Sequence, residues 1–217
     1  RSWSKPLCRV QADNRTEDTG MSDREEDAQD RWNAAMNAAV AAKSGEVFND
    51  VVFNFGVEII NFPEFPQADF EVLLGLIQDH RLHGMNGSWN LIAVFNYEFD
   101  RLNTEQEEQL LKVLHRVHAS FSDWHTPFYI AEMIGQRYPD GRGLDAFQRM
   151  AKTRNQISRA FIPNGLEILA RTAKDPLIKN RAMDQILSMR GDVSDQVKKE
   201  VDMAIERLVD RGAMGRA

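Results

Sequence analysis

Residues 104–117 read TEQEEQLLKVLHRV, and this stretch decides how the rest of the chain is interpreted. Thr104 and Glu107 form a T-x-x-E capping box, in which each side chain is expected to satisfy a free backbone N–H at a helix start. Leu110, Leu111 and Leu114 then recur with the three- and four-residue spacing of one helix face. The stretch therefore predicts an amphipathic helix that buries one side.

The segment 46–61 is the hardest to assign. It is rich in β-branched and aromatic side chains, which favour strands. Strict alternation is nevertheless broken at Val51-Val52-Phe53, and the apolar residues with the spacing of one helix face are Phe48, Val51, Val52, Phe55 and Ile59. We predict a helix here as well.

Capping and breaking residues divide the remaining chain into further helices. Thr126-Pro127 and Asp175-Pro176 each place a capping side chain before a proline at the first helical position. The segment 138–143 (YPDGRG) is predicted to be a turn, and 162–165 (IPNG) to break or kink a helix. Another capping box, Ser22 with Glu25, predicts a helix that continues to about residue 44. With about nine or ten short helices and no predicted strand, the expected class is all-α.

Composition limits the number of domains and the cellular environment. A chain of 217 residues with 42% hydrophobic content can form one core of ordinary size. We expect residues 1–20, which precede the first methionine, to be a disordered N-terminal extension or tag, and residues 21–217 to form a single all-helical domain. Cys8 is the only cysteine, which excludes an internal disulfide. No segment has the length and apolarity of a membrane span or a signal peptide, so a cytoplasmic protein is expected.

Two stretches near the end carry a family resemblance. Residues 175–187 (DPLIKNRAMDQIL) resemble the second half of a HEAT unit, in which an aspartate-led turn opens a helix with spaced aliphatic residues. Residues 195–208 (DQVKKEVDMAIERL) form a similar run. The resemblance implies a HEAT-like solenoid of stacked helix pairs, with a continuous groove for partners. An irregular α-α superhelix or a compact helical bundle is the alternative.

Metal and phosphate sites are the chemical sites that the sequence brings to mind, and each has a structural explanation. His80 and His83 form one H-x-x-H pair, and His115 and His118 form a second, so these spacings would allow a metal site completed by Glu108 or Glu132. Each pair lies beside arginine at a polar helix edge, and no known metal-binding motif surrounds it. The glycines at 141 and 143 lack the strand and the G-K-[ST] motif of a phosphate loop. We therefore expect no metal, no cofactor and no catalytic residues.

Large aromatic side chains are the best candidates for a partner-binding surface, because such residues dominate interface hot spots. The aromatic candidates are Trp89, Trp124 and Tyr129, and the acidic candidates are Asp123, Glu132 and Asp140. The alternative is that the aromatic residues fill the core and that the acidic ones are helix caps or solvated faces.

A net charge of −6 argues against a general binder of phosphate backbones and favours a basic partner. We expect a non-catalytic protein-binding protein similar to bacterial immunity proteins, which neutralise a cognate toxin, here a basic toxin domain. One alternative is an enzyme of the HEAT-like DNA glycosylase type, favoured by the basic residues Arg137, Arg142, Arg149, Lys152, Arg154 and Arg159. A general helical-repeat scaffold or adaptor is the third hypothesis. The oligomeric state is not predicted.

Overall fold

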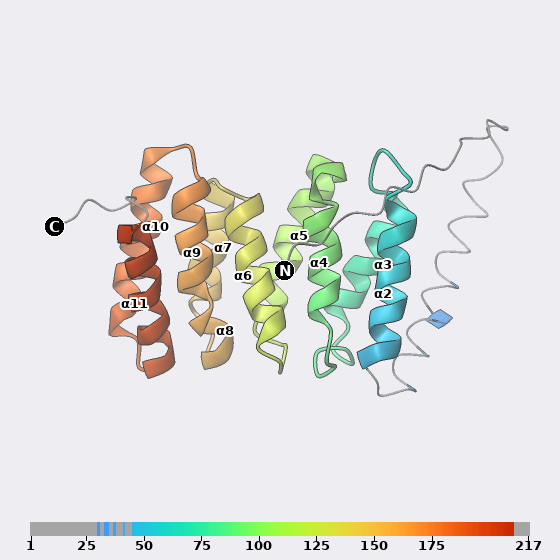
Figure 1. Ribbon diagram of the computed structural model, residues 1–217, viewed down its shortest axis with the longest axis horizontal. Coiled ribbons are helices and arrows are strands. Elements are labelled where there is room, and N and C mark those ends of the chain that lie inside the picture. The colour runs from blue at the N-terminus through green and yellow to red at the C-terminus, as the bar shows by residue number, and fades with distance from the viewer. Residues whose placement is uncertain (1–29, 31–32, 35–36, 38–40, 42–44, 211–217) are drawn as a thin grey trace.

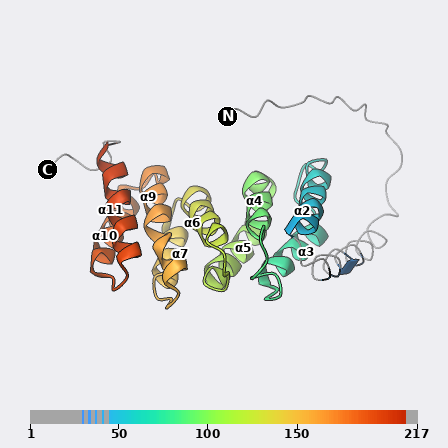
Figure 2. The same ribbon diagram turned by 60° about the horizontal axis from the view of Figure 1, so that its bottom comes forward.

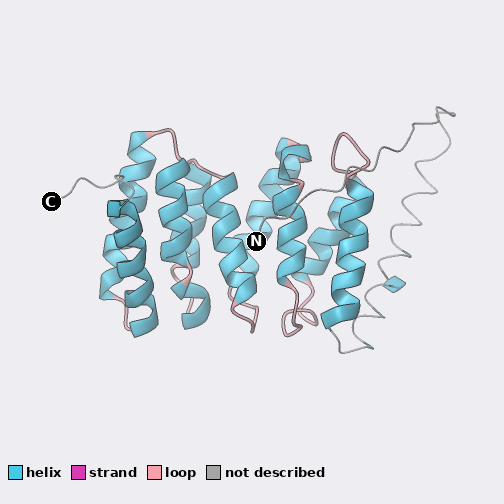
Figure 3. Ribbon diagram, viewed as in Figure 1, coloured by secondary structure: helices cyan, strands magenta, loops and turns pink. Residues whose placement is uncertain are grey.

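The structure is a computed structural model that describes residues 30, 33–34, 37, 41 and 45–210. Within these residues every regular element is a helix, and Figure 3 shows helices joined by short loops. The elements, with two short 3-10 helices labelled η, are α2 (Gly45–Ile59), α3 (Gln67–Gln78), α4 (Trp89–Tyr97), η1 (Phe99–Arg101), α5 (Thr104–Val117), α6 (His125–Arg137), α7 (Gly141–Met150), α8 (Gln156–Ala160), α9 (Ile162–Thr172), α10 (Pro176–Ser188), η2 (Met189–Gly191) and α11 (Asp195–Asp210).

The predicted all-α class is confirmed for this part of the chain. The extension predicted at 1–20 and the helix predicted to begin at Ser22 lie outside the described residues, apart from a few positions between 30 and 41. None of the described helices is both long and apolar enough to cross a membrane.

The helices pack in two rows. Contacts join α2 to α4, α4 to α6, α6 to α9 and α9 to α11 in one row, and α3 to α5, α5 to α7 and α7 to α10 in the other. Figure 1 shows the elongated body that results, and Figure 2 shows the two rows from a second direction. Since each helix buries its apolar face between the rows, one continuous core runs along the molecule. The HEAT-like resemblance stays a prediction, because layered helix packing is not restricted to that family.

Helix α2 settles the ambiguous segment. Phe48, Val52 and Ile59 are buried in the core with helical spacing, which confirms the helix prediction. Phe53 and Ile60 belong to the same strand-like run but are exposed. The high β-propensity of this segment is therefore overridden by tertiary packing on one helix face.

The capping box of α5 differs from the predicted one by one residue. The backbone N–H of Gln106 donates to Asn103 Oδ1 at 2.9 Å, and the backbone N–H of Asn103 donates to Gln106 Oε1 at 3.0 Å. The prediction of Thr104 and Glu107 was wrong for a tertiary reason. The side chain of Gln106 is buried and also donates to the carbonyl of Phe65 at 3.2 Å, a partner from a distant loop.

The start of α6 also differs from the prediction. Asp123, rather than Thr126, provides the capping carboxylate: it accepts from the backbone N–H of Thr126 at 2.7 Å and from its hydroxyl at 2.8 Å. At α10 the prediction is confirmed, because Asp175 accepts from the backbone N–H of Leu177 at 2.8 Å ahead of the proline-initiated helix.

The turn predicted over 138–143 is shorter than expected. Helix α7 already begins at Gly141, because Asp140 accepts a hydrogen bond from the backbone N–H of Arg142 at 2.8 Å and so caps the helix. The break predicted at 162–165 is present one residue earlier. Helix α8 ends at Ala160, Phe161 separates the two helices, and Pro163 lies in the first turn of α9, where its missing N–H does no harm.

Two glycines set the distance between α6 and α9. A Cβ placed on Gly165 would lie 2.6 Å from the carbonyl oxygen of Ala131 and would also clash with the ring of Phe147. A Cβ placed on Gly135 would clash with the carbonyl oxygen of Gly165. The two backbones therefore touch at a point that admits no side chain, and this contact fixes how α6 and α9 lie in the row.

Candidate functional site

Trp89 and Tyr129 form the centre of a group of aromatic side chains at the N-terminal ends of α4 and α6. Their rings stack with centroids 5.0 Å apart and an interplanar angle of 15°. Phe128 meets Tyr129 edge-on at 5.6 Å. All three side chains are half-buried, so each still presents part of its ring to solvent. The stacking of Trp89 on Tyr129 joins α4 to α6, two helices that are not adjacent in the sequence.

The group continues toward α8 and α9. Phe128 contacts Phe161 edge-on at 5.7 Å, and Phe161 lies 6.3 Å from the ring of Trp124. Trp124 in turn stacks on His125, with centroids 3.6 Å apart. We call the six residues Trp89, Trp124, His125, Phe128, Tyr129 and Phe161 the aromatic surface. Because every ring contacts at least one other, the group holds its shape without a partner.

Trp124 is the most exposed member, with 54% of its surface open to solvent. It directly precedes α6, so the helix start holds it at the edge of the core. Ile157, on the adjacent short helix α8, is exposed as well. An indole left in water next to other partly exposed rings is typical of an interaction site.

Glu132 lies one turn along α6 from Phe128 and Tyr129, a spacing that puts all three on the same face of the helix. Its carboxylate is half-buried, and burial raises its pKa above the usual range. Among the described residues it has no hydrogen bond or ion pair. A desolvated carboxylate beside exposed rings is suited to accept a cationic group from a partner.

The other two acidic candidates have structural roles. Asp123 caps α6, as described above. Asp140 caps α7 and forms an ion pair with Arg142 at 2.9 Å. Burial alone would raise the pKa of Asp140, but the hydrogen bonds from Arg142 outweigh it and hold the pKa below the usual range. Asp140 follows the C-terminal end of α6, away from the aromatic surface at the N-terminal end.

The side chains of the two histidine pairs are involved in separate local contacts. His83 is buried, with Nε2 2.9 Å from the carbonyl oxygen of Ile77 and its ring 4.4 Å from that of Phe121. His118 is also buried, and its Nδ1 lies 2.9 Å from the carbonyl oxygen of His115. Within the described residues no three His, Cys, Asp or Glu side chains lie close enough together to hold a metal ion.

Three of the six basic residues that suggested a DNA-binding face are engaged within the protein. Arg137 donates to the side chain of Asn96 at 2.8 Å and to its carbonyl at 2.6 Å. Arg142 pairs with Asp140, as described above. The third, Arg159, is buried in a network of its own. These three guanidinium groups therefore hold the helices together rather than forming a cationic surface.

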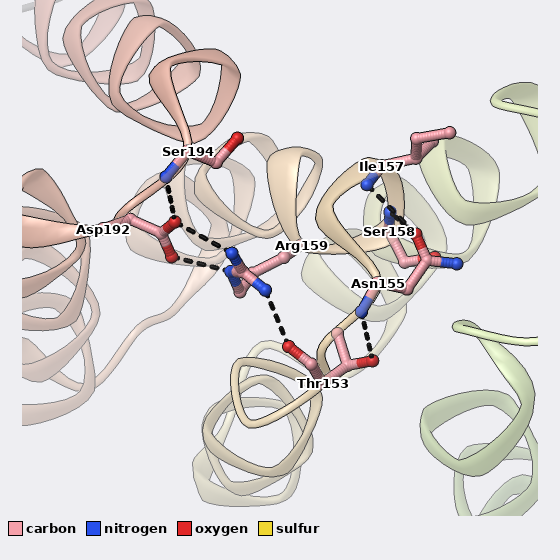
Figure 4. Close-up of polar contacts among 7 residues, drawn as sticks. All are labelled: Thr153, Asn155, Ile157, Ser158, Arg159, Asp192 and Ser194. Carbon is pink, nitrogen blue, oxygen red and sulfur yellow. Dashed lines mark hydrogen bonds and ion pairs between the residues drawn. The ribbon is translucent and has the colours of Figure 1, made fainter.

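Figure 4 shows the network around Arg159. The guanidinium forms a forked contact with Asp192, at 2.6 Å from Nε and 2.9 Å from Nη2, and donates to the carbonyl of Thr153 at 2.8 Å. Asp192 also accepts from the backbone N–H of Ser194 at 2.8 Å. The hydrogen bonds from Arg159 lower the pKa of Asp192. The network ties the loop before α8 to the loop before α11 and so supports the part of the fold that carries Phe161.

The structure thus brings together Trp89, Trp124 and Tyr129, places Glu132 on the same helix face as Tyr129, and uses Asp123 and Asp140 as caps. Sequence reasoning missed His125, Phe128 and Phe161 as members of the aromatic surface. Phe128 has a signal, because it adjoins Tyr129 at the start of a helix, whereas Phe161 joins the group only through the packing of α8 and α9 on α6. Comparisons with models of protein families, with curated proteins and with solved structures found no match.

Proposed function

We propose that this chain is a protein-binding protein that docks its partner on the aromatic surface. The observation that carries the proposal is the continuous contact of aromatic rings from Trp89 to Trp124, part of which remains exposed. Rigid aromatic side chains supply a large apolar contact at little cost in conformational entropy. Preformed stacking lowers that cost further, because the rings are ordered before the partner arrives.

The charges near this surface favour a basic partner. Glu132 is half-buried and has no ion pair among the described residues, so its carboxylate is available to form an ion pair with a lysine or arginine of the partner. The chain as a whole carries a net charge of −6, which speeds the encounter with a positively charged protein. A basic partner that presents an arginine between apolar contacts fits both features.

Within this class we propose a role as an immunity protein that neutralises a basic, nuclease-like toxin domain. The support for this narrower proposal is the acidic balance of the chain together with a binding surface that requires no chemistry of its own. A toxin whose active site binds nucleic acid is necessarily basic around that site. A ring-lined, acidic surface can cover such a site and exclude its substrate.

The test is a binding experiment with matched variants. The chain is used as bait in its native host, and any toxin encoded beside its gene is co-expressed with it in a growth assay. We expect Trp124→Ala and Glu132→Lys to weaken capture of the specific partner by roughly 30-fold or more, the range of an interface hot spot. Val193→Ala, which changes an exposed apolar residue in the loop before α11, is the control and should bind as the unchanged chain does.

Two results would contradict the proposal at two levels. A partner that binds the Trp124→Ala and Glu132→Lys variants as well as the unchanged chain would exclude the aromatic surface as the docking site. A specific partner that depends on this surface, combined with no rescue from any neighbouring toxin, would leave protein binding in place and remove the immunity role.

A further inference from the structure

A second surface lies on the other side of α4. A groove of about 860 Å³ runs between α2 and α4. Phe53 and Val57 of α2, with Ile60 directly after the helix, form one wall, and Ala93 and Tyr97 of α4 form the other. Gly56 and Ala93 carry small or absent side chains, which leaves space between the two helices. This groove is separate from the stacked pair Trp89–Tyr129, which connects α4 to α6 instead.

The walls of the groove are apolar and open to water. Phe53 is 70% exposed and Tyr97 is 81% exposed. The exposed residues 53 and 57 of α2, and residue 60 just after its end, have the spacing of one helix face, on the side opposite the buried Phe48 and Val52. A contiguous apolar face of this kind is unfavourable in water and is typical of a docking site.

The two ends of the groove differ in charge. At one end the uncharged side chains of Asn49 and Asn90 hydrogen-bond to each other. At the other end Asp100 is exposed, and its only described ion pair is a 3.4 Å contact with Arg137. Both α2 and α4 also end there, and the C-terminus of a helix carries partial negative charge.

Arg101 does not cancel this negative end. Its Nη1 donates to the backbone carbonyls of Ile60 and Phe62, and its Nε pairs with Glu98 at 2.8 Å. The guanidinium is therefore committed to the end of α2 and to a neighbouring carboxylate. The groove is apolar along its length, neutral at the asparagine end and acidic at the end where Asp100 lies.

We propose that this groove binds an amphipathic helix of a partner protein, with its apolar face on α2 and α4 and a lysine or arginine at the end that meets Asp100. From Asn49 to Ile60 the wall is roughly 17 Å long at the rise of an α-helix, which matches a docked helix of about three turns. The open walls suit a helix that lies along them better than a small molecule, which proteins usually enclose. A second copy of this acidic chain would bring like charge to the acidic end.

The probe is a synthetic, fluorescein-labelled peptide of about 14 residues, built from alanine and glutamine with leucines along one helix face and lysines at one end. A sister peptide carries glutamates in place of the lysines, and a scrambled peptide keeps the composition but loses the apolar face. Binding to the full chain is measured by fluorescence anisotropy at low and at physiological salt. We expect the lysine peptide to bind more tightly than both of the others, and by a larger factor at low salt.

Variants of the chain locate the binding site. Val57→Lys should weaken binding of the lysine peptide by about tenfold or more, because it places a cation in the apolar wall. Asp100→Asn should weaken it by about threefold and should leave binding of the glutamate peptide no weaker. The matched control is Val193→Lys, at a residue that is 86% exposed and remote in sequence from both helices. Phe53→Gln, at another exposed wall position, gives a second independent readout, and far-UV circular dichroism verifies that all variants fold.

The proposal is overturned if the lysine and glutamate peptides bind equally, or if Val57→Lys and Phe53→Gln bind as tightly as Val193→Lys. Light scattering provides a further criterion. A dimer that Val57→Lys converts to monomers would show that a second copy covers the groove. Neither measurement uses the partner of the aromatic surface, so failure here leaves the proposed function untouched, and the reverse also holds.

Discussion

Replacing Gly165 with alanine tests the contact on which the row of helices depends. The added Cβ would lie 2.6 Å from the carbonyl oxygen of Ala131, whereas ordinary Cβ contacts begin at 3.4 Å. The fit therefore requires a displacement of almost 1 Å. The atoms in the way belong to the backbone of α6 and to the buried ring of Phe147, neither of which can move freely.

The expected cost follows from two opposing effects. Overpacking of this kind typically costs about 1–3 kcal/mol, and a clash with backbone belongs at the upper end. Alanine is a better helix former than glycine by about 1 kcal/mol, which offsets part of the cost. We expect a net loss of about 2 kcal/mol in the free energy of unfolding, which corresponds to about 4–8 °C in melting temperature for a domain of this size.

The assay is urea unfolding followed by far-UV circular dichroism, with Gly191→Ala as the matched control. A Cβ at Gly191 meets nothing within 4 Å, so that variant should stay within about 0.5 kcal/mol of the unchanged chain. If Gly165→Ala is as stable as Gly191→Ala, α6 and α9 do not touch as described. Phe161 would then not be held against Phe128, and the argument for the aromatic surface would fail with it.

Three further predictions concern charged and titrating groups. Asp192→Asn should lower the free energy of unfolding by about 3 kcal/mol, because it leaves the buried Arg159 without its counter-charge. A double-mutant cycle with Arg159→Met measures the coupling between the two residues, and purely additive effects would refute this prediction. Burial lowers the pKa of His118, so the folded state binds fewer protons than the unfolded state, and the free energy of unfolding should fall as the pH drops below about 6.5. Urea unfolding at a series of pH values should show a smaller fall for His118→Gln than for the unchanged chain. Because burial raises the pKa of Glu132, its ionisation disfavours the folded state at neutral pH. Glu132→Gln should therefore raise the urea midpoint of unfolding at neutral pH while weakening partner binding, and a lowered midpoint would contradict this prediction.

Local chemistry explains which helix starts were predicted correctly from the sequence and which were predicted one or more residues away from their true position. Asp175 was correctly predicted to cap α10, because a cap followed by proline depends only on residues within the first turn. At α5 the sequence offers two capping boxes one residue apart. Asn103 and Gln106 form the observed one, because the side chain of Gln106 also donates a hydrogen bond to the carbonyl of Phe65. At α6 the helix begins earlier than Thr126 and Pro127 predicted, and Asp123 accepts hydrogen bonds from both the backbone N–H and the hydroxyl of Thr126.

The candidate site was only partly predictable, for a different reason. Residue type was enough to single out Trp89, Trp124 and Tyr129, since large amphipathic rings are characteristic of binding surfaces. It could not separate Glu132 from Asp123, because both are carboxylates in or just before the same helical segment. Their roles differ only in what surrounds them: Asp123 has a backbone donor within reach, whereas Glu132 is half-buried and has no hydrogen bond or ion pair to any residue that the structure describes.

The sequence by itself determined that this protein is built from short helices, because capping residues and the spacing of apolar side chains act within one or two turns. It also determined the acidic balance of the chain and the residue types available for binding. Only the tertiary structure decided which rings meet and which apolar residues stay in water. Contacts such as Trp89 with Tyr129, and the open groove between α2 and α4, depend on how separate helices pack against one another, and that packing is set by distant close approaches such as the one at Gly165.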